Sequence, residues 1–168
     1  MPQTAKSPSK TSARSSAPDA VQLLTTDHKE VKALFKEYDK LVEQDKGDEE
    51  KEALARQICL MLTVHATIEE ELFYPAARDA IEEVDLLDEA EVEHGSAKEL
   101  IAQIESMKPS ESLYDARVKV LGEYVSHHVK EEEGELFPKV KKAKVDLASL
   151  GEAIAARKKD LIPEMAAQ

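Results

Sequence analysis

The chain has 168 residues, and its formal net charge of −12 at pH 7 disfavours nucleic acid and anionic membrane surfaces as partners. Tryptophan is absent, aromatic residues make up 4 % and there are only five glycines, a composition that favours long helices over sheet. A single cysteine, Cys59, excludes an internal disulfide, and no apolar run approaches the length of a membrane span. These numbers predict one all-α domain in the cytoplasm.

Residues 1–18 are rich in Ser, Thr, Pro and Ala and contain basic but no acidic side chains. Such a segment cannot bury a core, so a disordered basic tail is predicted. Apolar residues then recur at three- and four-residue steps, which predicts a first helix over 19–44. It ends before DKGDEE, where Gly47 suits a C-cap and the acidic residues suit the start of the next helix.

A second helix is predicted from about 48 to 82, with a kink or a break at Pro75. The third spans about 86–107 and ends at KPSES, where Ser110 is expected to cap the fourth helix. Short connections between long helices place neighbours antiparallel, which predicts an up-down-up-down four-helix bundle.

The fourth helix is predicted over about 111–143, with Pro138 placed in it as Pro75 is in the second. A last amphipathic segment, about 146–160, is expected to fold back over the bundle before Pro163. The domain division is therefore a tail at 1–18, a bundle at 19–145 and a C-terminal helical extension at 146–168.

One motif occurs twice, as HATIEEELFYP at 65–75 and as HVKEEEGELFP at 128–138. In each copy a histidine and a glutamate stand four residues apart on the inward face of a helix, as His65 with Glu69 and His128 with Glu132. The first and third helices each add one inward histidine, His28 and His94.

Burying four imidazoles and two carboxylates together is costly unless something cationic compensates them. A pair of metal ions would do so, because carboxylates can bridge two ions in a helix-bundle core. Nitrogen and oxygen ligands without thiolate favour iron or manganese, with zinc or copper also possible.

These residues resemble those of the hemerythrin-like proteins of the HHE cation-binding type over about residues 20–143. The resemblance rests on DH at 27–28, the motif at 65–75, EVEH at 91–94 and HHVKEEEGELFP at 127–138. It implies a four-helix bundle that holds two iron ions joined by an oxo or hydroxo bridge, with Glu69 and Glu132 as bridging carboxylates. The metal ligands that it implies are His28, His65, Glu69, His94, His128 and Glu132.

Two points stay open within this site. His127 and Glu131 are also four residues apart, so the register of the fourth helix could shift by one. The third helix has Ala90 and Lys98 four residues from His94, where oxygen-carrying hemerythrins have a second histidine. Either Glu91 or solvent and small oxidants then complete the metal coordination. In addition, Tyr124 and His127 are candidates for hydrogen bonds to the metal ligands, without binding the metal themselves.

With one histidine fewer than in oxygen-carrying hemerythrins, the iron site would have more open coordination positions. Such a site favours the binding or reduction of a small molecule such as O2, NO or peroxide, in oxidative or nitrosative stress defence. One alternative is an iron or oxygen sensor without turnover, so whether the protein is an enzyme stays open. Another is a metal-free structural bundle. A small-molecule ligand is the expected partner, with neither nucleic acid nor membrane.

Overall fold

The computed structural model describes residues 17–168, and every regular element in that range is a helix, which confirms the all-α fold. The predicted tail lies outside the described residues except for positions 17 and 18. The elements are α1 Ala20–Glu43, α2 Asp48–Ile68, η1 Glu69–Phe73, α3 Tyr74–Ala80, α4 Val84–Ser106, α5 Tyr114–Glu131, η2 Glu132–Leu136, α6 Phe137–Lys142 and α7 Leu147–Ala166.

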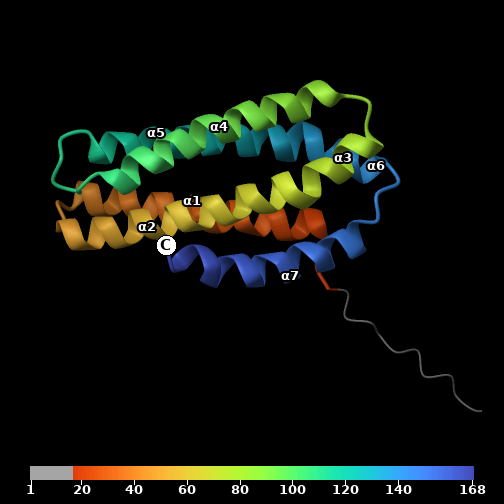
Figure 1. Ribbon diagram of the computed structural model, residues 1–168. Helices are drawn as coiled ribbons and strands as arrows, with labels where there is room; N and C mark the ends of the chain where they lie inside the picture. Colours follow the sequence, from red (N-terminus) through yellow and green to blue (C-terminus); the bar gives the residue numbers. More distant parts are fainter. Residues whose placement is uncertain (1–16) are drawn as a thin grey trace, which may run out of the picture.

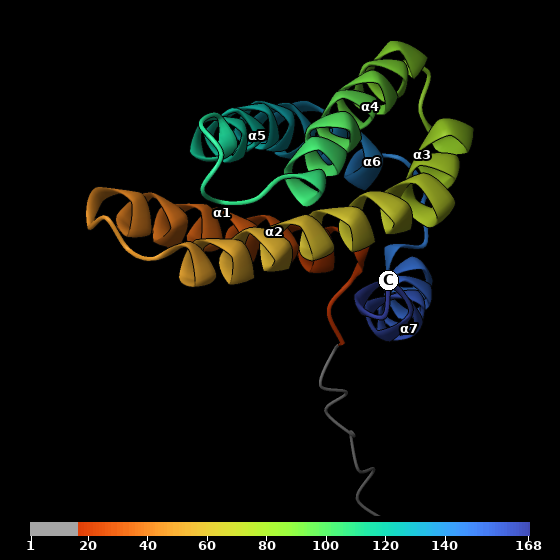
Figure 2. The ribbon, with the colours of Figure 1, turned by 60° about the vertical axis from the view of Figure 1, so that its left-hand side comes forward.

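Four helical columns form the bundle (Figure 1), and α1 packs against α2 as α4 packs against α5. The π-helical turn η1 joins α2 to α3 without a break, and η2 joins α5 to α6 in the same way. Helix α7 runs along α1 and α2, on the side away from α4 (Figure 2). None of the helices in residues 17–168 combines the length and the apolar character needed to cross a membrane.

Two apolar clusters fill the bundle, one at each end. The cluster nearer the start of α1 includes Leu24, Ile68 and Phe73, and the cluster at the other end includes Tyr38 and Tyr114. The inward histidines and glutamates lie between the two clusters, so apolar packing on both sides holds the polar layer in place.

The loop from α1 to α2 differs in detail from the prediction. Gly47 is not the C-cap of α1 but the N-cap of α2, with an extended backbone at φ −64° and ψ 158°. The left-handed residue of this loop is Asp45, with φ 49°, a conformation that short polar side chains tolerate. The predicted acidic first turn of α2 is present, as Asp48, Glu49 and Glu50.

The start of α5 also differs, because Ser110 does not cap it. The helix begins at Tyr114 after Leu113, whose side chain makes no capping bond. Residues 108–113 form turns instead, in which the Glu111 carboxylate accepts a hydrogen bond from the Lys108 amide at 2.6 Å. Tyr114 is 2 % exposed, so packing of this ring determines where the helix begins.

The C-terminal helix α7 is longer than predicted and continues through Pro163 to Ala166. A proline in a helix loses one hydrogen bond of the ladder. Here that loss falls near the end of the helix, where Leu161 is buried and Met165 packs against the apolar cluster. Packing therefore outweighs the local preference of the proline.

Both motif copies contain a π-helical turn immediately before their proline. The Tyr74 amide donates to the Glu69 carbonyl, and the Phe137 amide donates to the Glu132 carbonyl, each five residues back. Because proline has no amide proton, the helical ladder is interrupted at this point in any case, and one extra residue is accommodated there. The extra residue rotates every later side chain relative to a straight α-helix.

Gly151 sets how closely α7 approaches the start of α1. A Cβ at this position would lie 2.8 Å from the Pro18 carbonyl oxygen and 2.9 Å from the Ala20 amide nitrogen. We expect Gly151→Ala to lower the free energy of unfolding by about 1 to 3 kcal/mol, as overpacking usually does. Gly95→Ala, with nothing within 4 Å, should raise it by about 0.5 to 1 kcal/mol. Urea denaturation measures both, and equal effects would contradict the close approach.

Candidate metal centre

Each of the four long helices of the bundle supplies one inward histidine. His28 lies on α1, His65 on α2, His94 on α4 and His128 on α5, and the side chains are 4 to 12 % exposed. Glu69 and Glu132 are the first residues of η1 and η2 and are 0 % and 3 % exposed. The structure thus brings these six predicted residues into one buried cluster.

The cluster divides into two groups that share both glutamates. The first half consists of His28 and His65, and the second half consists of His94 and His128. Within each half, the ligand atoms of the two histidines and of Glu69 and Glu132 all lie within 4.8 Å of one another. Such spacing suits one cation in each half.

Each glutamate presents one oxygen atom to each half. Glu69 Oε1 is 2.8 Å from His65 Nε2, whereas Glu69 Oε2 is 3.0 Å from His94 Nε2. Glu132 Oε1 is 3.5 Å from His28 Nε2, whereas Glu132 Oε2 is 2.8 Å from His128 Nε2. This is the arrangement that two carboxylates need in order to bridge two metal ions.

The other nitrogen of every histidine is held by a separate carboxylate. His28 Nδ1 and Glu133 Oε1 are 3.1 Å apart, and His94 Nδ1 and Glu70 Oε1 are 3.0 Å apart. The Nδ1 atoms of His65 and His128 make the corresponding contacts with Asp27 at 3.1 Å and with Glu93 at 2.5 Å. An Nδ1 proton donated to a carboxylate leaves Nε2 free to bind a cation and fixes the plane of the ring, as in known metal sites.

Two buried oxygens test whether a cation fits this cluster. Glu69 Oε1 and Glu132 Oε1 accept no well-directed hydrogen bond in the described residues, although His65 Nε2 lies only 2.8 Å from the former. The Nε2 atoms of His28 and His65 are 3.1 Å apart, and those of His94 and His128 are 3.2 Å apart. Unpartnered acceptors opposite converging imidazole nitrogens are what a metal ion would satisfy, so the residues present fit such an ion.

Tyr74 also contacts the second half, and it was not among the site residues predicted from the sequence. Its hydroxyl lies 3.0 Å from Glu69 Oε2 and 2.8 Å from Glu132 Oε2, so its single proton can be donated to either carboxylate, and it lies 3.1 Å from His94 Nε2. The available signal was a difference between the motif copies, because Tyr74 stands where the second copy has Phe137. Phe137 instead stacks on His28 in the first half, with ring centroids 5.9 Å apart.

The other candidates from the sequence lie outside the cluster. Glu91 is 57 % exposed and accepts a hydrogen bond from Arg78 at 3.1 Å. His127 is 64 % exposed, 3.1 Å from Glu131 and 3.7 Å from Glu93. Tyr124 is 52 % exposed and lines a cavity beside the cluster. The fourth-helix residue that points inward is thus His128.

The pKa values of the buried groups reflect this crowding of charge. Burial alone would lower the pKa of His65, but the negative charge of Glu69 and the hydrogen bond to Asp27 raise it to about 10. Burial alone would also lower the pKa of His128, but the hydrogen bond and the negative charge of Glu132 raise it to about 9. Burial would raise the pKa of Glu69, yet His65 holds it well below its usual value. Without a metal, protons on His65 and His128 therefore compensate the negative charge of the buried carboxylates.

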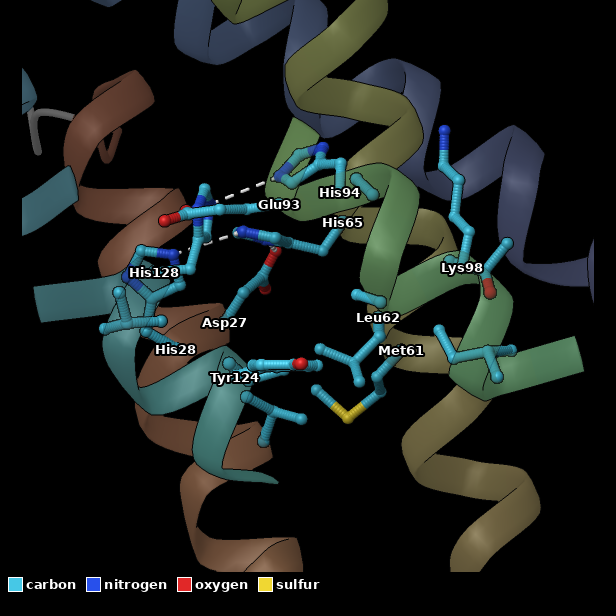
Figure 3. Close-up of a pocket in the computed structure, with 17 residues that line it drawn as sticks. Asp27, His28, Met61, Leu62, His65, Glu93, His94, Lys98, Tyr124 and His128 are labelled. Carbon is cyan, nitrogen blue, oxygen red and sulfur yellow. Dashed lines mark hydrogen bonds and ion pairs between the residues drawn. The ribbon is translucent and has the colours of Figure 1, made fainter. Parts of the chain in front are cut away.

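A cavity of about 50 Å³ adjoins all four histidines. Figure 3 shows the histidines along one side of it, with Met61, Leu62 and Tyr124 across from them. Most of the remaining wall is apolar, including Val31, Ile101 and Val125. Since one water-sized probe needs about 10 to 15 Å³, the cavity has room for a diatomic molecule or a peroxide beside the imidazoles.

Comparisons with known proteins agree with this geometry. The hemerythrin HHE cation binding domain family matches residues 19–140. A crystal structure of a hemerythrin HHE cation binding domain-containing protein from Mycobacterium kansasii has a TM-score of 0.73 and 25 % identity, over 88 % of this chain and 90 % of that one.

A protein of Nostoc sp. (strain PCC 7120 / SAG 25.82 / UTEX 2576) named DNA nickase is 33 % identical over 119 residues. That match covers 71 % of this chain but only 32 % of the relative, so the chain spans about a third of it. The family match and the paired histidine and glutamate groups together identify a metal-binding domain. The chain belongs to the hemerythrin HHE cation-binding domain family.

Proposed function

We propose that the protein holds two non-haem iron ions in this cluster and uses them to bind or reduce a small molecule such as O2, NO or peroxide. The observation that carries the proposal is the division of the Glu69 and Glu132 oxygens between the two halves. Two carboxylates that each face both halves are suited to two ions rather than one. A role in oxidative or nitrosative stress defence would follow from this chemistry.

The ligand chemistry supports iron. The cluster offers imidazole nitrogens and carboxylate oxygens, and the single cysteine, Cys59, belongs to the apolar cluster at the far end. Such a donor set suits iron or manganese, while zinc is the weaker candidate in this proposal. When bound, two irons would supply one electron each, which matches the two-electron reduction of a peroxide.

The chain's own residues restrict what reaches the centre. The cavity is small and mostly apolar, which admits small neutral molecules and excludes large or charged ones. Tyr74 keeps its proton, because burial and then the charges of Glu69 and Glu132 raise its pKa well above the usual value. Its hydroxyl is therefore positioned to donate a hydrogen bond within the second half.

The match to the Nostoc relative does not support an activity on DNA. The matched segment is about a third of that protein, and a net charge of −12 repels the DNA phosphates. The competing proposal is an iron or oxygen sensor, in which metal occupancy changes stability without turnover.

Metal content and peroxide consumption test the proposal. We expect about two irons per chain after anaerobic loading with Fe²⁺, a visible absorption that changes on addition of peroxide, and catalytic loss of peroxide. Two irons without turnover would favour the sensor. One ion per chain, or none, would contradict the dinuclear centre.

A further inference from the structure

The C-terminal helix α7 reaches the metal centre through one side chain, although it lies beyond the matched residues 19–140. The Lys158 ammonium forms an ion pair and hydrogen bond with Asp27 Oδ1. The other oxygen of this carboxylate, Oδ2, accepts the hydrogen bond from His65 Nδ1 at 3.1 Å. A continuous chain of contacts thus runs from α7 through Asp27 to a histidine of the first half.

The internal repeat of the bundle shows what Lys158 adds. Asp27 precedes His28 and holds His65, just as Glu93 precedes His94 and holds His128. Outside the cluster, however, the two carboxylates have different partners among the described residues. Glu93 lies 3.7 Å from the imidazole of His127, a side chain that is 64 % exposed. Asp27 instead forms an ion pair with the Lys158 ammonium. Helix α7 packs chiefly on α1 and α2, the helices that carry His28 and His65 of the first half.

Burial makes the contact with Lys158 consequential. The Asp27 side chain is 8 % exposed, and that of Lys158 is 32 % exposed. A buried carboxylate that loses one of its charged partners is strongly disfavoured, so it turns toward water or changes its remaining contacts. For Asp27 the remaining contact is the one that fixes the ring of His65.

We propose that Lys158 is a positioning residue for the first half, which holds Asp27 so that His65 Nε2 stays directed at the metal. The proposal rests on the dinuclear centre proposed above, but not on its reaction. It makes the two halves unequal, with an ion in the first half that depends on the docking of α7 and an ion in the second half that does not.

Four variants isolate this role. Lys158→Met keeps the apolar stem and removes the charge, and Lys158→Arg restores a cation. Arg157→Met removes a neighbouring ion pair of α7, in which Arg157 lies 2.7 Å from Glu71, and leaves the contact between Lys158 and Asp27 in place. Lys159→Met removes an exposed charge from the same turn of the helix.

The first measurement uses the metal-free protein, so it does not depend on the metal centre. In the spectrum of ¹⁵N-histidine-labelled protein, the Nδ1 proton of His65 should give a hydrogen-bonded, slowly exchanging signal. We expect this signal to weaken or disappear in Lys158→Met and to return in Lys158→Arg. It should be unchanged in Arg157→Met and Lys159→Met.

The second measurement is an anaerobic titration with Co²⁺, followed by its visible absorption. Lys158→Met should weaken one of the two bound ions about tenfold, the low end of the loss known for partners of metal-bound histidines, and leave the other nearly unchanged. An unaltered His65 signal in Lys158→Met would overturn the proposal, and so would an equal effect of Arg157→Met. If no Co²⁺ binds, the dinuclear centre fails, while the signal of the metal-free protein still decides the role of Lys158.

Discussion

Replacing Glu69 by glutamine is expected to abolish binding of both metal ions. Glu69 contributes Oε1 to the first half and Oε2 to the second, and glutamine keeps only one oxygen and no charge. Loss of a partner that only orients a ligand costs about 10 to 100-fold in metal affinity, so loss of a shared ligand should exceed that in both halves at once. Metal content after loading and dialysis measures the effect.

The segment supplies its own matched control, because Glu71 lies two residues further along the same π-helical turn. Glu71 is 43 % exposed in its side chain and pairs with Arg157 on α7. Glu71→Gln removes the same charge from the same turn, and it should retain both ions. If Glu69→Gln kept one ion at normal affinity, the glutamate would not be shared between two ions.

The sequence allows the fold and the inward residues to be predicted because both depend on helical periodicity. The spacing of His65 from Glu69, and its recurrence as His128 and Glu132, places four polar groups on the core face in any straight helix. The structure brings these residues together with His28 and His94. Helix boundaries were less predictable, since burial of Tyr114 and of Leu161 determined where α5 begins and how far α7 extends.

Tyr74 could not be placed because of the π-helical turn. Continued α-helical spacing from Glu69 predicts Leu72 and Ala76 on the inward face, but both are only half-buried. The extra residue brings Tyr74 and Ala77 inward instead, at 2 % and 0 % exposure. A π-helical turn has no clear composition signal, although both copies have a proline just after it.

The outer contacts of the histidines were unpredictable for a different reason. Asp27 and Glu93 each hold a histidine on another helix, so their roles depend on tertiary packing and not on local spacing. Lys158 is separated from Asp27 by 131 positions. Only the docking of α7 on α1 and α2 brings them together.

The metal-free protein is expected to lose stability as pH rises, whereas the metal-loaded protein gains it. Without metal, His65 and His128 have pKa values of about 10 and about 9 in the folded state, against a usual 6.5. A raised pKa contributes stability that is fully present below pH 6.5 and is lost as pH rises through the folded value. The free energy of unfolding should therefore fall by on the order of a few kcal/mol across this range.

Metal binding reverses the sign, because a metal competes with protons for the same imidazole nitrogens. At higher pH the histidines are more readily deprotonated, so the ion binds more tightly and adds more to the stability of the folded state. Urea unfolding at pH 6.5 and at pH 9, with chelator and with added metal, measures both slopes. His65→Gln should flatten the slope of the metal-free protein, and His127→Gln should not, because His127 is 64 % exposed. A metal-free protein equally stable at both pH values would show that the buried histidines do not carry protons in place of the metal.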